Sequence, residues 1–122
     1  MPGPGARAMA ALAEYCGDLT TAGIPADTDR TRVQVPGAWV SLQNLDITRL
    51  DGGGTARVHV HLVVPDNGDT AAQPALAALF DRFTAAGHTW ADGEPVDTAW
   101  AAVVGPTTSP VPAWRVPVDL DF

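Results

Sequence analysis

Residues 55–65 read Thr-Ala-Arg-Val-His-Val-His-Leu-Val-Val-Pro, and this stretch decides the fold. Apolar side chains occupy every second position from Ala56 to Val64, while Arg57, His59 and His61 stand between them. Successive side chains of a β-strand point to opposite faces of the sheet, so this alternation predicts a strand with one face on a core.

The run before this strand, residues 38–50, is also rich in β-formers. Its apolar positions change parity after Leu42, which predicts a bulge near Asn44. Asp51-Gly52-Gly53-Gly54 follows and predicts a flexible hairpin connection between the two strands. Because this glycine-rich loop joins two strands and does not precede a helix, it does not indicate a phosphate-binding motif.

Two segments have the three- and four-residue spacing of apolar side chains that predicts a helix. Residues 6–21 form the first, after a flexible leader at 1–5, and Gly23 and Pro25 end it. Residues 71–86 form the second, with Thr70 as the expected N-cap. Its apolar stripe is expected to lie on the sheet and consists of Leu76, Leu79, Phe80 and Phe83.

Three further strands are predicted, a short one at 33–35 and longer ones at 96–104 and 111–122. Pro112 and Pro117 imply that the last is an edge strand or that its pairing is interrupted at those points. The order of elements predicts one α+β domain over residues 1–122. A mostly antiparallel β-sheet of about four to five strands would carry two α-helices packed on one face.

Composition excludes several classes of function. The chain has 122 residues, with 14 acidic residues against seven arginines and no lysine, and a net charge of −7. This charge disfavours tight binding to nucleic acid or to an anionic membrane. Cys16 is the single cysteine, so the chain forms no internal disulfide, and no apolar run approaches the roughly 20 residues of a membrane span. We expect a protein of the reducing cytoplasm.

His59 and His61 lie two positions apart on the polar face of the strand and could form half of a metal site. Spacing places no third ligand, and Arg57 beside them opposes a cation, so a solvated or interface-facing stripe is the preferred interpretation. Ser41 and Ser109 lack a nucleophile-elbow motif and ordered histidine and aspartate partners. We therefore predict no catalytic, cofactor-binding or metal-binding residue, and no enzyme.

Four tryptophans are a large apolar content for a domain of this size, which can bury only about 65% of its unfolded-chain surface. Tryptophan is over-represented at the centres of protein interfaces. We expect one or two in the core, and Trp39 and Trp90 in contacts with other subunits. The others are Trp100 and Trp114.

Three stretches of the chain carry a resemblance to a known family. One is the break Gly23-Ile24-Pro25 with the turn Pro36-Gly37-Ala38-Trp39-Val40. The second is the hairpin over residues 47–65 that leads into an Ala/Leu helix. The third is the terminal strand Pro112-Ala113-Trp114-Arg115-Val116-Pro117-Val118. In this layout residues 12–122 resemble the tail terminator (tail-completion) proteins of long-tailed phages, especially those of actinobacteria.

The resemblance implies a structural protein of the virion, assembled in the cytoplasm of the host bacterium. Tail terminators form a homo-oligomeric ring, usually a hexamer, on the head-proximal end of the tail tube. The ring stops tube elongation and offers a surface to the head-tail connector or stopper protein. Tube protein and connector are thus the implied partners, and genome DNA would pass through the lumen without specific binding. An acidic ring wall would repel DNA and let it slide.

A cyclic assembly needs two different patches on each subunit. We expect the contacts with a neighbour or the tube to involve Trp39, Trp90, the hairpin with Asp51 and Gly53, and the face with Arg57, His59 and His61. Three alternatives stay open: another neck or stopper protein, a small metal-dependent enzyme that uses His59 and His61, and a bacterial interaction domain outside any phage.

Overall fold

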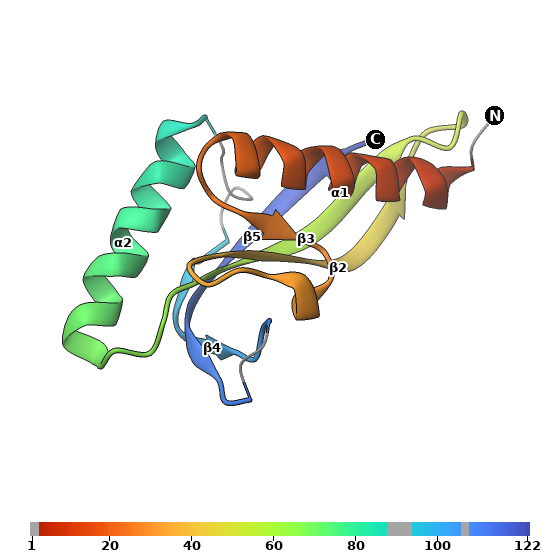
Figure 1. The fold of residues 1–122 in the computed structure, drawn as a ribbon. Helices are drawn as coiled ribbons and strands as arrows, with labels where there is room; N and C mark the ends of the chain where they lie inside the picture. The colour runs from red at the N-terminus through yellow and green to blue at the C-terminus, as the bar shows by residue number, and fades with distance from the viewer. Residues whose placement is uncertain (1–2, 88–93, 106–107) are drawn as a thin grey trace.

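The computed structural model describes residues 3–87, 94–105 and 108–122 (Figure 1). The sheet has the order β1-β2-β3-β5-β4, and all its neighbours are antiparallel except β1 and β2. The predicted α+β class with a mostly antiparallel sheet is confirmed. The elements are α1 (Pro4–Thr21), β1 (Ala26–Asp27), the 3-10 turn η1 (Arg30–Arg32), β2 (Gly37–Ile47), β3 (Gly54–Val63), α2 (Asp69–Ala85), β4 (Asp97–Ala102) and β5 (Val111–Asp121).

β3 lies at the centre of the sheet, and its alternation is as predicted. Ala56, Val58, Val60 and Leu62 are fully buried in the main hydrophobic cluster. The same cluster holds side chains from both helices and from the neighbouring strands, including Leu12, Leu19, Leu76, Phe83, Val40 and Val116. Burial of apolar surface is the main favourable term in folding, so this cluster fixes how the helices sit against the sheet.

Helix α1 begins at Pro4, two residues before the predicted start, so Pro4 and Gly5 are not part of a leader. Proline is favoured in the first helical turn because its missing N–H would have no partner there. The side chains that α1 buries follow the predicted spacing: Ala8, Leu12, Tyr15, Cys16 and Leu19. Of the helices in the described ranges, neither is both long enough and apolar enough to cross a bilayer.

Helix α2 extends over Asp69–Ala85, and its buried side chains include the predicted Leu76, Leu79 and Phe83. The predicted N-cap is wrong. Gly68 takes that position with a φ of 90°, and Thr70 lies inside the first turn. A glycine adopts this left-handed backbone without steric cost, so the turn geometry outweighs the hydrogen bond that a threonine cap would add.

The β2–β3 hairpin has the predicted irregularity, because its register shifts between Leu42 and Asn44. The predicted strand at 33–35 is wrong. Residues 26–27 form the short strand β1 instead, and residues 30–32 form a 3-10 turn. Val33 packs with Val63 and Val104 in a second, smaller hydrophobic cluster, so its burial reflects a packed loop and not a strand.

Strand β5 is not an edge strand, because it pairs with β3 on one side and with β4 on the other. The backbone N–H groups of Gly54 and Phe122 each donate to the carbonyl of the other. Along an antiparallel ladder, hydrogen-bonded pairs of residues alternate with pairs that are not hydrogen-bonded to each other. His59 and Pro117 are therefore a pair without mutual hydrogen bonds. The nitrogen of Pro117 faces the side where β4 has not yet begun, so β5 tolerates this proline in the interior of the sheet.

Candidate functional site

The polar face of β3 lies opposite the main core and carries Arg57, His59 and His61. We call this side of the sheet the outer face. Strands β2, β4 and β5 bring further polar and aromatic side chains onto it, among them Trp39, Trp100 and Arg115. Sequence spacing predicts the three β3 residues on one face, but it does not show what the neighbouring strands place against them.

Arg57 is held by two carboxylates from other elements. Its guanidinium donates two hydrogen bonds to Asp119 on β5 and lies 3.4 Å from an oxygen of Glu94. The hydrogen bond to Asp119 raises the pKa of Arg57 above its ordinary value, as does the charge of Glu94. Arg57 is thus an internal cross-link of the outer face with about a third of its side chain exposed.

His61 lies between two tryptophans and is only 4% exposed. Its ring stacks on Trp39 with centroids 4.5 Å apart, and the Trp100 centroid lies at 6.4 Å. Nε2 is 3.0 Å from Oγ of Ser41, whereas Nδ1 is buried without a hydrogen-bond partner. Burial lowers the pKa of His61 to about 4, and the nearby His59 and Arg115 act in the same direction. His61 therefore presents almost no surface of its own on the outer face, contrary to the prediction that it is a contact residue.

The contact between Ser41 and His61 was not expected from sequence, and it resembles half of a catalytic dyad. A serine nucleophile needs a base that takes its proton and a third group that orients the base. Nδ1 of His61 meets no carboxylate, and an imidazole with a pKa near 4 is a weak base at neutral pH. Gln43 also donates to Ser41 Oγ, at 2.9 Å. The arrangement gives Ser41 Oγ and His61 Nε2 hydrogen-bond partners but leaves Nδ1 of His61 without one, so it lacks the group that would orient a base.

His59 is partly buried beside His61, with ring centroids 6.1 Å apart and the planes nearly perpendicular. Desolvation and the charges of Arg115 and Arg57 lower the pKa of His59. Within the described ranges, no group of three histidine, cysteine or acidic side chains has the geometry to hold a metal ion. The side chains around the two histidines are Arg57 and Arg115 together with Trp39 and Trp100.

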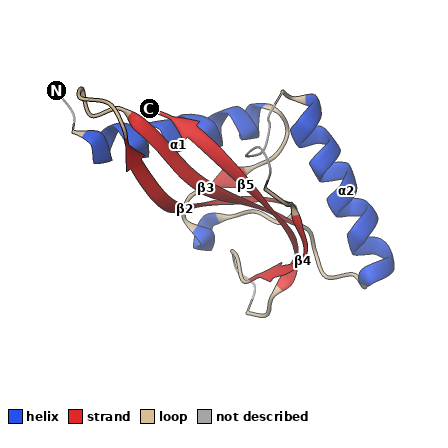
Figure 2. Ribbon diagram, turned by 180° about the vertical axis from the view of Figure 1, so that it is seen from behind, coloured by secondary structure: helices blue, strands red, loops and turns tan. Residues whose placement is uncertain are grey.

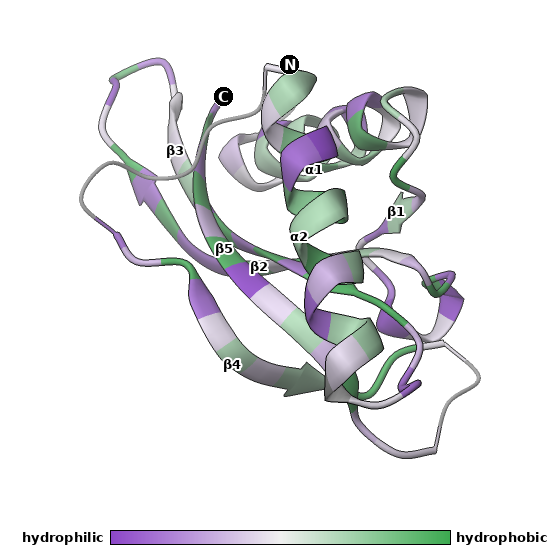
Figure 3. Cartoon of the chain, turned by 90° about the vertical axis from the view of Figure 1, so that its left-hand side faces the viewer, coloured by the Kyte–Doolittle hydropathy of each residue, from purple (hydrophilic) through white to green (hydrophobic). Residues whose placement is uncertain are grey.

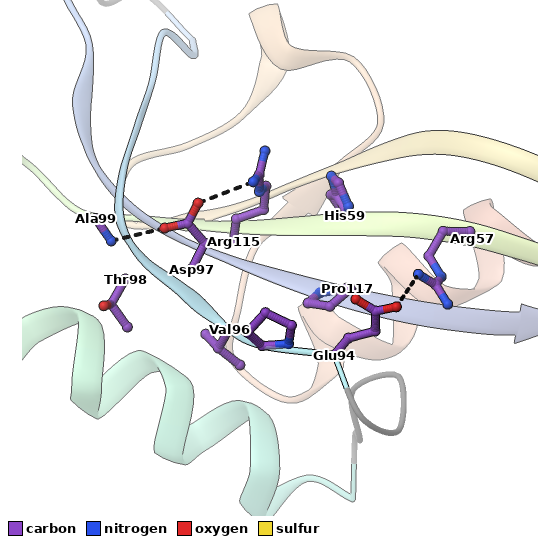
Figure 4. A pocket seen from close by; sticks show the side chains of 10 residues that line it. Arg57, His59, Glu94, Val96, Asp97, Thr98, Ala99, Arg115 and Pro117 are labelled. Carbon is purple, nitrogen blue, oxygen red and sulfur yellow. Dashed lines mark hydrogen bonds and ion pairs between the residues drawn. The ribbon is translucent and has the colours of Figure 1, made fainter.

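A pocket of about 420 Å³ opens on the outer face between β3, β5 and the segment that leads into β4 (Figure 4). Two ion pairs cross it, Arg57 to Glu94 and Arg115 to Asp97, the latter at 3.1 Å. The guanidinium of Arg115 also lies 4.1 Å above the ring of Trp100. These ion pairs and the cation–π interaction hold β4 and the segment before it against β3 and β5.

The other predicted contact residues lie at two places. Asp51 and Gly53 are in the β2–β3 turn, where Asp51 Oδ1 accepts from the N–H of Gly53 at 2.8 Å and its carbonyl accepts from Arg7. Gly53 is buried. Trp39 is half-buried and donates from Nε1 to the carbonyl of Thr28 at 3.3 Å. Trp90 lies outside the described residues.

Exposed large apolar side chains gather at the two edges of the sheet, and no sequence pattern predicts this. Leu42, Leu45 and Ile47 on β2 are 39%, 38% and 52% exposed. Trp100 and Val103, both 39% exposed, lie in β4 and just beyond it. The remaining two in the described residues are Met9 and Leu50. Figure 2 shows β2 and β4 on opposite sides of the sheet.

Comparison with protein-family models, with curated proteins and with solved structures found no match to this chain. The outer face holds a network of internally satisfied charges. The edges hold apolar side chains that this chain leaves partly uncovered.

Proposed function

We propose that this protein is a structural subunit of a phage tail, a tail terminator that forms a ring at the head-proximal end of the tail tube. The observation that carries the proposal is the placement of exposed apolar side chains at two opposite edges of one sheet, on β2 and at β4. A head-to-tail ring requires two different surfaces on each subunit, and these edges supply them. The resemblance of the chain to terminator proteins is the reason for placing this ring at the head-proximal end of the tail tube.

The charge of the chain supports the same function. Seven arginines stand against 14 acidic residues. Of these arginines, four form ion pairs with carboxylates of the same chain: Arg32, Arg49, Arg57 and Arg115. A ring of such subunits has a strongly negative surface, which repels the DNA backbone and lets the genome pass without being held.

The placement of the ring is tested by labelling virions of the phage that encodes this chain. Antibodies raised against the purified protein and marked with gold should bind at one point, the junction of head and tail. Preimmune serum on the same particles is the control. Gold along the whole tube, at the distal tip or on no part of the particle would contradict the proposal.

A further inference from the structure

We infer that copies of this chain join edge to edge, the free edge of β2 pairing with β4 of the next copy so that their sheets continue into one another. This inference deepens the proposed function and rests on the ring that it contains. It names the two surfaces that meet and the direction in which the strands run.

The first support is the backbone of β2. Thr48 and Arg49 donate to the carbonyl of Gly53, and Gly54 bonds Phe122 on the other side, which sets the alternation of the ladder. By this alternation, the residues of β2 whose N–H and C=O groups point away from β3 are Val40, Leu42, Leu45 and Ile47. In the described part of the chain, β1 covers β2 only at Ala38 and Trp39.

The second support is that the two edges match in direction. β2 is antiparallel to β3, β3 to β5, and β5 to β4, so β2 and β4 of one chain run in opposite directions. A second copy related by rotation about a ring axis therefore presents its β4 antiparallel to β2 of the first. Antiparallel pairing of strands is the commoner arrangement in sheets.

The third support is the apolar surface. A symmetric contact of β2 with β2 of another copy would cover Leu42, Leu45 and Ile47 but leave Trp100 and Val103 exposed. The head-to-tail contact borders both sets, with Leu42, Leu45 and Ile47 on the core side of the joined sheet and Trp100 on its outer face. At the β4 edge, Asp97 Oδ1 already accepts from the N–H of Ala99 at 3.2 Å, so the new backbone pairing involves residues 101–103.

The size of the contact favours a ring over a dimer. The six residues of β4 span about 20 Å, and a sheet is about 10 Å thick, so the contact covers about 200 Å² in projection. A stable pair of proteins needs about 800 Å² on each partner. One edge contact is thus too small to hold two copies alone. In a closed ring each subunit makes two such contacts, and the last contact closes without a further loss of translational freedom.

Cross-linking of single-cysteine-addition variants tests the inference. Leu45→Cys with an affinity tag and Ala99→Cys without one are mixed at about 1 mM and treated with a short bismaleimide. Native Cys16 is buried and stays in place. We expect tagged–untagged dimers at least fivefold above either homodimer. Ala75→Cys is the matched control, because Ala75 is exposed and lies on helix α2 and not on either edge strand.

Circular dichroism of each variant confirms that it is folded before cross-linking. Predominant Leu45→Cys homodimers would overturn the head-to-tail pairing, and so would yields no higher than those of the Ala75→Cys control. Gold at the neck of virions without edge cross-links would overturn this inference alone. Edge cross-links without gold at the neck would overturn the terminator proposal alone.

Discussion

Replacing Phe83 by alanine is expected to lower the free energy of unfolding by about 3–5 kcal/mol. Phe83 is fully buried and belongs to the cluster that joins α2 to the sheet. The truncation loses the transfer free energy of the ring and leaves a cavity that neighbours such as Val60 fill only in part. The loss is a large fraction of the stability of a domain of this size, so a part of the variant should be unfolded at 37 °C.

Urea unfolding followed by tryptophan fluorescence measures this change. Leu50→Ala is the control, because Leu50 is fully exposed in the β2–β3 turn and its truncation should change the free energy by less than about 0.5 kcal/mol. If Phe83→Ala and Leu50→Ala cost the same, α2 does not contribute to the core in the way described.

Stability should fall as the pH falls from 6.5 to 4, and His61 should account for about 3 kcal/mol of that loss. The pKa of His61 is about 4 in the folded chain against an ordinary value of 6.5. Between these values the unfolded chain binds a proton that the folded chain does not, so acidification favours unfolding. Each unit of difference corresponds to about 1.4 kcal/mol. At pH 5, about 2 kcal/mol of this loss should already be present.

The matched variant is His61→Phe, which keeps an aromatic ring between Trp39 and Trp100 and removes the titrating group. Urea unfolding at pH 7, 6 and 5 should give a shallower dependence on pH for this variant than for the natural chain. His59→Gln is the control and should keep most of the dependence, because His59 is less buried. Equal slopes for His61→Phe and the natural chain would contradict the buried neutral imidazole.

The central strands could be predicted from sequence because their two faces differ in polarity. Ala56, Val58 and Val60 alternate with Arg57 and His59, and this pattern predicts both the strand and its orientation. Figure 3 shows hydrophilic and hydrophobic segments following one another along the strands of the sheet. The shift of parity after Leu42 likewise predicts the irregularity of the hairpin. Both signals are local, and a local signal can be read without knowledge of the partner strand.

The errors arise where tertiary neighbours decide the structure. Val33 is an apolar residue that Val63 and Val104 from distant elements bury. An apolar residue in a short polar segment predicts a strand there, whereas the structure has a packed loop. Pro117 suggested an edge strand, yet its nitrogen faces a gap left by the late start of β4. The burial of His61 depends on Trp39 and Trp100, which lie on other strands. The spacing of residues within β3 alone therefore cannot predict that His61 is buried.

The candidate edges could not have been found from sequence for a related reason. Leu42, Leu45 and Ile47 follow the same pattern as residues of a buried strand, and only the order of strands makes β2 an edge beyond Trp39. Exposure of an apolar side chain is a property of the whole sheet.

The length of tails tests most directly the proposal that this chain stops the growth of a tail tube. A stop codon at Trp39 would be introduced into the gene in the phage genome, with a synonymous change at Val40 as the control, and the lysates compared by negative-stain electron microscopy. We predict overlong tubes without heads from the stop codon and normal particles from the control. Tails of normal length from the stop codon, whether joined to heads or not, would contradict tail termination.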